Sequence, residues 1–207
     1  AEVVGRRAVG PGDDQIVELG IVDLDKPLVV VTGGGLGAES INSGIVKIAP
    51  TLLDEGYALY HVTGKKHYDA VKSRAPEHPD YHIVPFVYKD MPLVLGAADV
   101  VVSRGSATFL QELAALAKPT IIVPASQLGD QVKNALSYET ADAAFVLNDR
   151  VVREGDELLH AIKRSIESPD DVQAMAERFH AFARPSAAVE VAQLIVGAAH
   201  RRKQDNT

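Results

Sequence analysis

Apolar and polar positions alternate along this chain in two regular ways from residue 27 onward. Short, nearly unbroken apolar runs such as Leu28–Thr32 are typical of strands buried on both faces of a parallel sheet. Between these runs, apolar residues recur at helical spacing, as at Ile41, Ile45 and Ile48. The pattern predicts strands over 28–32, 57–62, 82–86, 99–103, 119–123 and 144–147. It predicts helices over 38–54, 66–74, 107–117, 130–138, 154–165, 170–182 and 186–199, and one more beginning at Asp90.

Strict alternation of strands and helices predicts the α/β class. We expect a doubly wound, mostly parallel, Rossmann-like sheet of about six strands with helices on both faces. Such sheets bind ligands beyond the carboxyl ends of their strands, where we expect segments 32–38, 63–65, 103–107 and 124–131 to meet. Residues 1–26 are predicted to be an irregular lead-in or linker with one short strand near 16–19. Residues 27–200 are predicted to form the binding domain, and 201–207 a polar tail.

Composition narrows the classes of function. The net charge of −7 argues against a nucleic-acid partner, which usually needs a basic face. The absence of cysteine excludes disulfides and thiolate metal sites and fits a reducing compartment. The seven histidines show no metal-ligand spacing, so we predict no metal and no cofactor. No apolar stretch approaches the ~20 residues that cross a bilayer.

A glycine-rich turn follows the first predicted strand and consists of Gly33, Gly34, Gly35, Leu36, Gly37 and Ala38. It fits the loose dinucleotide pattern G-x-G-x-x-A, in which free backbone N–H groups face a phosphate. The second strand ends in His61 and Thr63 without the acid that would hold the ribose of NAD. An NADP-binding reductase domain remains an alternative, because Lys65 and Lys66 could meet a 2′-phosphate.

A second turn of small residues follows the fourth predicted strand, from Ser103 to Ala107, and opens another helix. Glu112 lies in the second turn of that helix, and its carboxylate can accept both hydroxyls of a ribose. Asp130 is a good helix N-cap, and Gln131 has donor and acceptor groups that suit sugar hydroxyls. No complete set of nucleophile, base and acid is visible, so the chain is predicted to bind a nucleotide rather than to carry a whole catalytic site.

The order of these motifs resembles the C-terminal, donor-binding half of the MurG-like glycosyltransferases, family 28 of the glycosyltransferase-B superfamily. The resemblance covers residues 27–200, and its blocks are Gly33–Ala38 with Asn42, His61–Lys65, Phe86–Asp99, Arg104–Glu112, Lys118–Pro124 and Asp130–Ala135. That family is an inverting one that transfers N-acetylglucosamine from UDP-N-acetylglucosamine to a lipid-linked acceptor in cell-wall synthesis. Gly35 stands where the family usually has a hydroxyl residue, and Gly105-Ser106 reverses the family's usual Ser-Gly order. The resemblance therefore identifies UDP more firmly than it identifies the sugar or the acceptor.

The resemblance implies roles for particular residues. The glycine turn would lie by the diphosphate and sugar, backbone groups near Val87 would read the uracil, Glu112 would hold the ribose, and Gln131 would contact the sugar. The resulting substrate-binding candidates are Gly33, Gly34, Gly35, Leu36, Gly37, Ala38, Asn42, His61, Val87, Arg104, Gly105, Ser106, Ala107, Thr108, Glu112, Asp130 and Gln131.

The resemblance also implies a missing part. The family's N-terminal half holds the acceptor and the general base, so no catalytic base is assigned in this chain, and alone it is expected to be inactive. Its expected partners are a UDP-sugar and either that acceptor-binding half or a separate membrane-associated subunit. A non-catalytic subunit of a split glycosyltransferase is the second alternative. The expected location is cytoplasmic, peripheral to the inner face of the membrane through the missing half.

Overall fold

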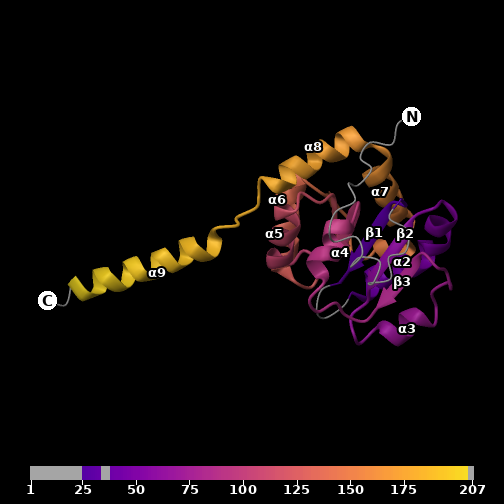
Figure 1. Cartoon of the computed structure of the whole chain (residues 1–207), viewed down its shortest axis with the longest axis horizontal. Coiled ribbons are helices and arrows are strands. Elements are labelled where there is room, and N and C mark those ends of the chain that lie inside the picture. Colours follow the sequence, from indigo (N-terminus) through magenta and orange to yellow (C-terminus); the bar gives the residue numbers. More distant parts are fainter. Residues whose placement is uncertain (1–24, 34–37, 205–207) are drawn as a thin grey trace.

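A parallel sheet of six strands in the order β3-β2-β1-β4-β5-β6 forms the centre of the molecule (Figure 1). The computed structural model describes residues 25–33 and 38–204. Every neighbouring pair of strands is parallel. The strands are β1 (Leu28–Thr32), β2 (Ala58–Val62), β3 (Tyr81–Val84), β4 (Val100–Ser103), β5 (Thr120–Ile122) and β6 (Phe145–Val146). The strand order reverses direction between β1 and β4, which makes this the switch point where such sheets bind ligands.

Helices cover both faces of the sheet, which confirms the predicted doubly wound fold. They are α2 (Glu39–Asp54), α3 (Tyr68–Lys72), α4 (Met91–Ala97), α5 (Ala107–Ala115), α6 (Gly129–Thr140), α7 (Asp156–Glu167), α8 (Pro169–His180) and α9 (Ala187–Gln204), with a 3-10 turn η1 at Val152–Glu154. Side chains alternate along β1. Val29 and Val31 share one core with α2 and α7, whereas Val30 belongs to the opposite core with α4, α5 and α6. Burial of both faces explains the continuous apolar run.

Element boundaries differ from the predicted ones where backbone chemistry intervenes. Strand β3 ends at Val84 rather than Phe86, and the Thr63 carbonyl, which could continue the pairing, accepts from the Asn42 amide instead. Helix α7 begins after Gly155, whose φ of +91° ends η1 and suits glycine. Helix α9 runs to Gln204, so part of the predicted loose tail is helical. The predicted lead-in strand near 16–19 lies outside the described residues.

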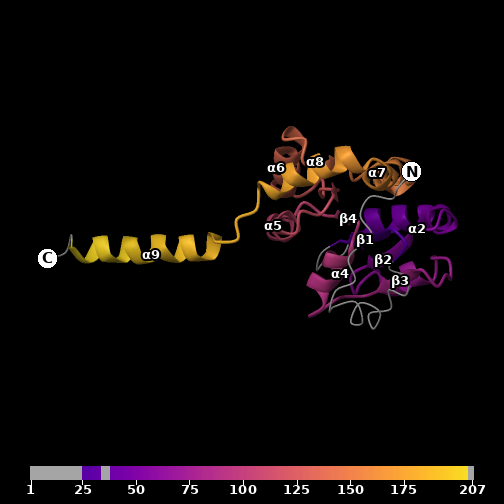
Figure 2. The same cartoon turned by 45° about the horizontal axis from the view of Figure 1, so that its top comes forward.

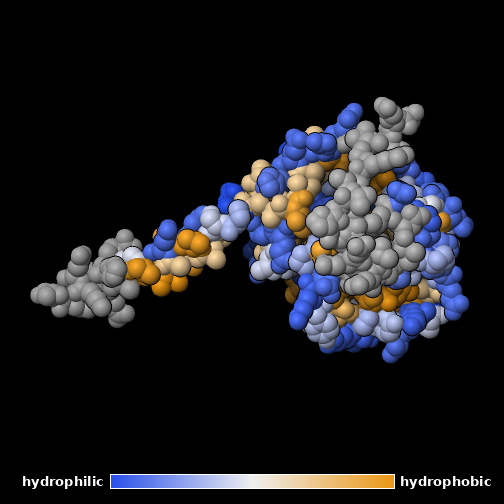
Figure 3. Space-filling view, in the orientation of Figure 1, coloured by the Kyte–Doolittle hydropathy of each residue, from blue (hydrophilic) through white to orange (hydrophobic). Residues whose placement is uncertain are grey.

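Helix α9 projects away from the rest of the molecule in two views that differ by 45° (Figures 1 and 2). Its exposed large apolar side chains are Val189, Val191, Leu194, Ile195 and Val196. Orange apolar surface is visible along this helix in Figure 3. Within residues 25–33 and 38–204, no helix is long and apolar enough to cross a membrane.

Candidate functional site

The carboxyl ends of the central strands meet at one edge of the sheet, which is called the rim here. Thr32 at the end of β1 pairs with Ser103 at the end of β4 and with Val62 at the end of β2. The chain after β5 joins the same edge, because the Val123 N–H donates to the Ser103 carbonyl at 2.8 Å. The described residues at the ends of these strands therefore lie side by side, as the alternation of elements predicted. Gly34, Gly35, Leu36 and Gly37 lie outside the described residues.

Helices α2 and α5 both begin at this rim, one after each of two neighbouring strands. Their N-cap residues, Ala38 and Ser106, have extended backbones and no side-chain capping bond. The first intrahelical bonds are donated by Asn42 and Leu110, at 2.9 Å in each helix. The backbone N–H groups of the first turn of each helix have no acceptor within the helix and carry its positive partial charge. Two adjacent helix starts therefore offer donors to an anion.

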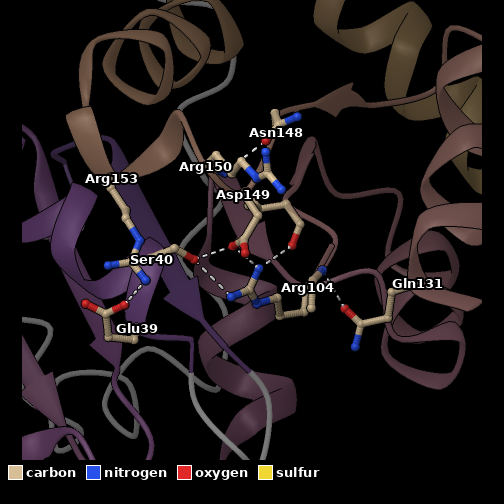
Figure 4. A network of polar contacts seen from close by, with 10 residues as sticks. Glu39, Ser40, Arg104, Gln131, Asn148, Asp149, Arg150 and Arg153 are labelled. Carbon is tan, nitrogen blue, oxygen red and sulfur yellow. Dashed lines mark hydrogen bonds and ion pairs between the residues drawn. The ribbon is translucent and has the colours of Figure 1, made fainter. Parts of the chain in front are cut away.

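Arg104 lies between β4 and α5, and its side chain turns toward α2 rather than toward open solvent (Figure 4). Its Nη1 donates to Asp149 Oδ1 at 2.5 Å and to the Val123 carbonyl at 3.1 Å. Its Nη2 donates to the Ser40 hydroxyl at 2.9 Å, and that hydroxyl donates to Asp149. The Arg104 guanidinium thus ties the rim together from inside, and its predicted contact with a ligand stays a prediction.

Gly105 and α6 hold the other side of the same loop. The Asn134 amide donates to the Gly105 carbonyl at 3.0 Å, as expected of a residue that supports the loop. A Cβ atom on Gly105 would lie 2.7 Å from the Gln131 carbonyl oxygen, so only glycine fits without displacing α6. The Gln131 side-chain oxygen accepts a hydrogen bond from the Ala125 N–H at 3.1 Å. Gln131 is therefore placed at the rim with its amide nitrogen left for another partner.

The remaining predicted residues of this part of the rim lie at its surface. Ala107, Thr108, Glu112 and Asp130 are exposed, and Ser106 is half-buried. The Ser106 and Thr108 hydroxyls are 3.4 Å apart, which brings polar groups together at the start of α5. The structure thus brings Gly105 through Thr108 together with Gln131, and leaves Glu112 accessible on the second turn of α5.

His61 was predicted to lie at the rim as a ligand contact, and this is wrong for its side chain. The ring is fully buried between α2 and β3, with 0% of the residue exposed. The Asn42 amide nitrogen donates to the Thr63 carbonyl at 3.1 Å, so its oxygen is left to accept from His61 Nε2 at 2.9 Å. The Tyr81 hydroxyl then donates to His61 Nδ1 at 3.0 Å. Burial lowers the pKa of His61 from 6.5 to about 3, so the ring is neutral.

The same network occupies Asn42, another predicted contact. The residue is 3% exposed and both atoms of its side-chain amide group have protein partners. Asn42 therefore anchors the first turns of α2 to the end of β2. Any contact between this residue and a ligand needs a different arrangement of its side chain.

Val87, the predicted uracil-reading position, is buried between two exposed aromatic residues. Phe86 is 38% exposed and Tyr88 is 75% exposed, and their rings meet edge to face with centroids 4.8 Å apart. Lys65 Nζ lies 5.6 Å from the Phe86 centroid and 5.1 Å from the Tyr88 centroid. The Val87 backbone thus lies in a loop between two aromatic side chains, and the Lys65 ammonium group makes cation–π contacts with both rings.

An open hollow of about 410 Å³ borders the Arg104 network and is lined by Ser126, Gln127, Asp149, Arg150 and Arg153. None of the individual substrate-binding candidates lines it, although Ser126 and Gln127 lie in the predicted rim segment 124–131. The hollow adjoins the loop that leads to Gln131. Among residues 25–33 and 38–204, no group of three or more His, Asp or Glu side chains could hold a metal ion. That no metal is needed stays a prediction.

Sequence reasoning missed Ser40 and Asp149, although both hold Arg104. Ser40 lies two residues after the glycine turn, where a hydroxyl in the first turn of a helix is a visible signal. Asp149 lies in the loop between β6 and η1, 45 residues from Arg104 along the chain. A single acid in a polar loop carries no local pattern that reveals such a partner.

The chain is similar to a known protein family and to known proteins. The glycosyltransferase family 28 C-terminal domain family matches residues 28–191. Two curated relatives carry the name UDP-N-acetylglucosamine–N-acetylmuramyl-(pentapeptide) pyrophosphoryl-undecaprenol N-acetylglucosamine transferase. The protein from an Exiguobacterium species is 37% identical over 83% of this chain and 47% of its own length. The protein from Listeria welshimeri is 31% identical over 95% of this chain and 54% of its own length. The chain thus spans about half the length of these relatives.

Solved structures show the same fold at lower identity. The crystal structure of Acinetobacter baumannii MurG matches with a TM-score of 0.64 and 22% identity, over 87% of this chain and 52% of that one. The calicheamicin glycosyltransferase CalG4 matches with a TM-score of 0.67 and 16% identity, over 86% of this chain and 46% of that one. Both likenesses concern the fold of about half of a longer chain.

Proposed function

This chain belongs to the glycosyltransferase family 28 C-terminal domain family, and we propose that it is the donor-binding half of an inverting glycosyltransferase, with UDP-N-acetylglucosamine as the donor. The two curated relatives described above are named for transfer of N-acetylglucosamine. Because the chain spans about half of their length, the second half of such an enzyme is a necessary partner in this proposal. The comparisons favour no reductase.

The observation that carries the proposal is the pair of helix starts at the switch point. Helices α2 and α5 follow β1 and β4, whose last residues pair with each other. A diphosphate placed at this rim can receive hydrogen bonds from backbone N–H groups of both helices. The same donors would stabilise the negative charge that UDP gains as it leaves the sugar. This role needs no net positive charge on the protein, which agrees with an acidic chain.

The rest of the site supplies recognition in this proposal. Glu112 accepts the ribose hydroxyls, backbone groups of Val87 meet the uracil, and the free amide nitrogen of Gln131 meets the sugar. Transfer to a hydroxyl also needs a general base, which is assigned here to the missing half. We therefore expect the chain alone to bind UDP and to transfer little sugar.

Calorimetry with UDP and ADP tests the proposal directly. UDP should bind and ADP should bind more weakly, because only the base differs between the two ligands. Titrations of the whole chain at equal ligand concentrations would show the difference as a ratio of Kd values. Equal binding of the two, or no binding of UDP, would contradict the proposal.

Replacing Glu112 by alanine tests the ribose contact. Loss of the carboxylate should weaken UDP binding by about 1–3 kcal/mol, because both ribose hydroxyls lose their acceptor. Glu139 is a matched control, since it is an exposed acid in the last turn of α6, away from the rim. Calorimetry should show weaker UDP binding for Glu112→Ala and unchanged binding for Glu139→Ala. Unchanged binding in both would place the ribose elsewhere.

The partner and location follow from the same proposal. The missing half, on the same chain or on a separate subunit, would hold the acceptor and bring the enzyme to the inner face of the membrane. The exposed apolar side chains of α9 support a partner, because water-exposed apolar surface of this kind is stabilised by burial. A metal ion has no role in the proposed transfer.

A further inference from the structure

Asp149 holds together parts of the molecule that are distant along the chain. Its Oδ1 accepts hydrogen bonds from Arg104 Nη1 at 2.5 Å and from the Ser40 hydroxyl. The side chains of Arg104 and Asp149 are 11% and 19% exposed, and Ser40 is buried. Charge-assisted hydrogen bonds shielded from water fix geometry more firmly than surface ion pairs do.

The two partners of Asp149 belong to the two helix starts. Ser40 lies in the first turn of α2, and Arg104 lies just before the N-cap of α5. These helices follow β1 and β4, which pair at Thr32 and Ser103. One carboxylate therefore bridges both helix starts, as the dashed contacts in Figure 4 show.

Further contacts keep the bridge in one geometry. Arg104 Nη1 also donates to the Val123 carbonyl at 3.1 Å, so the guanidinium is attached to the end of β5 as well. On the opposite side of the loop, the Asn134 amide holds the Gly105 carbonyl, and the Gln131 backbone packs against Gly105. The chain that leads into α5 is thus held from two sides, and Asp149 supplies the side that faces α2.

We propose that Asp149 is a positioning residue that acts through Arg104 and Ser40 to set the spacing between the starts of α2 and α5 for a nucleoside diphosphate. The inference rests on the proposed function, because it requires a diphosphate at the rim. A diphosphate has two anionic groups at a fixed separation, so its affinity for two clusters of N–H donors depends on the distance between them. A nucleoside without phosphate does not sense that distance.

Asp149→Asn tests this role because it keeps the size of the side chain and removes its charge. NMR titration of the whole chain would give Kd values for UDP and for uridine. We expect the UDP Kd to rise about tenfold, the equivalent of about one charge-assisted hydrogen bond, and the uridine Kd to stay within about twofold. Ser40→Ala, which keeps the ion pair, should raise the UDP Kd by about threefold.

Two more variants separate positioning from general damage. Asp149→Glu retains the charge and should bind UDP more tightly than Asp149→Asn. Asp142→Asn removes an exposed acid that pairs with Arg178 and should leave both Kd values unchanged. Equal weakening of UDP and uridine by Asp149→Asn, or no weakening of either, overturns the inference. A wild-type chain that does not bind UDP overturns the proposed function and this inference together.

Hydrogen exchange gives a readout that does not depend on any ligand. In Asp149→Asn, the first hydrogen-bonded backbone amides of α2 and α5, those of Asn42 and Leu110, should exchange faster, whereas those of α8 should not. Unchanged exchange at both helix starts overturns the inference even where UDP affinity falls. Faster exchange throughout the chain indicates general destabilisation and overturns it as well.

Discussion

Two polar networks hold the start of α2, and they differ in charge and burial. The neutral network of Asn42, His61 and Tyr81 joins α2 to β2 and β3 inside the core. The charged network of Ser40, Arg104 and Asp149 joins α2 to the loops after β4 and β6 and keeps some contact with solvent. All three residues of the neutral network are buried, whereas the charged network lies beside the proposed diphosphate site. We infer that the first serves folding and the second serves both folding and binding.

Removing the centre of the neutral network should have the largest effect on stability. His61→Ala leaves a cavity and takes hydrogen-bond partners from Asn42 and the Tyr81 hydroxyl. We expect the free energy of unfolding to fall by about 3–5 kcal/mol, as for large-to-small changes in a core. Urea unfolding monitored by circular dichroism would measure it. His160→Ala, at an exposed position on α7, is the control and should change little.

Lowering the pH should reduce the stability of the folded protein through the side chain of His61. The unfolded chain protonates His61 as the pH falls through about 6.5, whereas burial keeps the pKa of the folded protein at about 3. The unfolded state therefore binds the proton first, and stability falls as the pH is lowered across that window. Between pH 7 and pH 4.5 the loss from His61 should be about 2–3 kcal/mol.

The pH dependence can be assigned to His61 by comparison with His61→Gln. The variant lacks the titrating ring, so its free energy of unfolding should fall less over the same pH range when both proteins are unfolded in urea. Parallel pH profiles for the two proteins would show that His61 does not take up a proton on unfolding, and would remove the contrast between a neutral and a charged network.

Breaking the charged network should cost less stability. Arg104→Ala leaves the Asp149 carboxylate without its cation and the Val123 carbonyl without a donor. Removing one partner of a fully buried ion pair would lower the free energy of unfolding further, but here partial exposure lets water replace some of the lost contacts. We therefore expect the free energy of unfolding to fall by about 2 kcal/mol. Arg104→Lys should recover only part of this, since one ammonium group does not reproduce the forked contacts with Ser40, Asp149 and Val123. Equal stability of the lysine variant and wild type in urea would contradict the role given to that geometry.

The fold was more predictable than the networks, for a physical reason. Local alternation determines where strands and helices form, and the predicted strand 28–32 agrees with β1 residue for residue. The same alternation places His61 on the face of β2 that bears Leu59, toward α2, so its burial could have been read from the pattern. His61 was assigned to the rim only because it lies near the end of the strand predicted over 57–62.

Long-range pairs have no such local signal. The contact between Arg104 and Asp149 depends on the strand order, which brings the loops after β4 and β6 to one edge of the sheet. Sequence reasoning recognised Arg104 from its motif and assigned it to the ligand, but the direction of its side chain is set by an acid outside every motif. A sequence motif therefore predicts which segments lie at the rim more reliably than it predicts the direction of the side chains there.

The exposed ion pair between Arg178 and Asp142 should contribute the least to stability of the interactions compared here. Arg178 Nη2 contacts Asp142 Oδ2 at 2.6 Å, with 41% and 87% of the two side chains exposed. Asp142→Asn preserves the backbone, because asparagine tolerates the positive φ of 49° at this position, and the Asp142 carbonyl still accepts from Arg178 Nε. Water screens the lost charge, so the free energy of unfolding should change by less than about 0.5 kcal/mol in urea. A loss as large as that of Arg104→Ala would mean that burial does not distinguish the charged network from an ordinary surface pair.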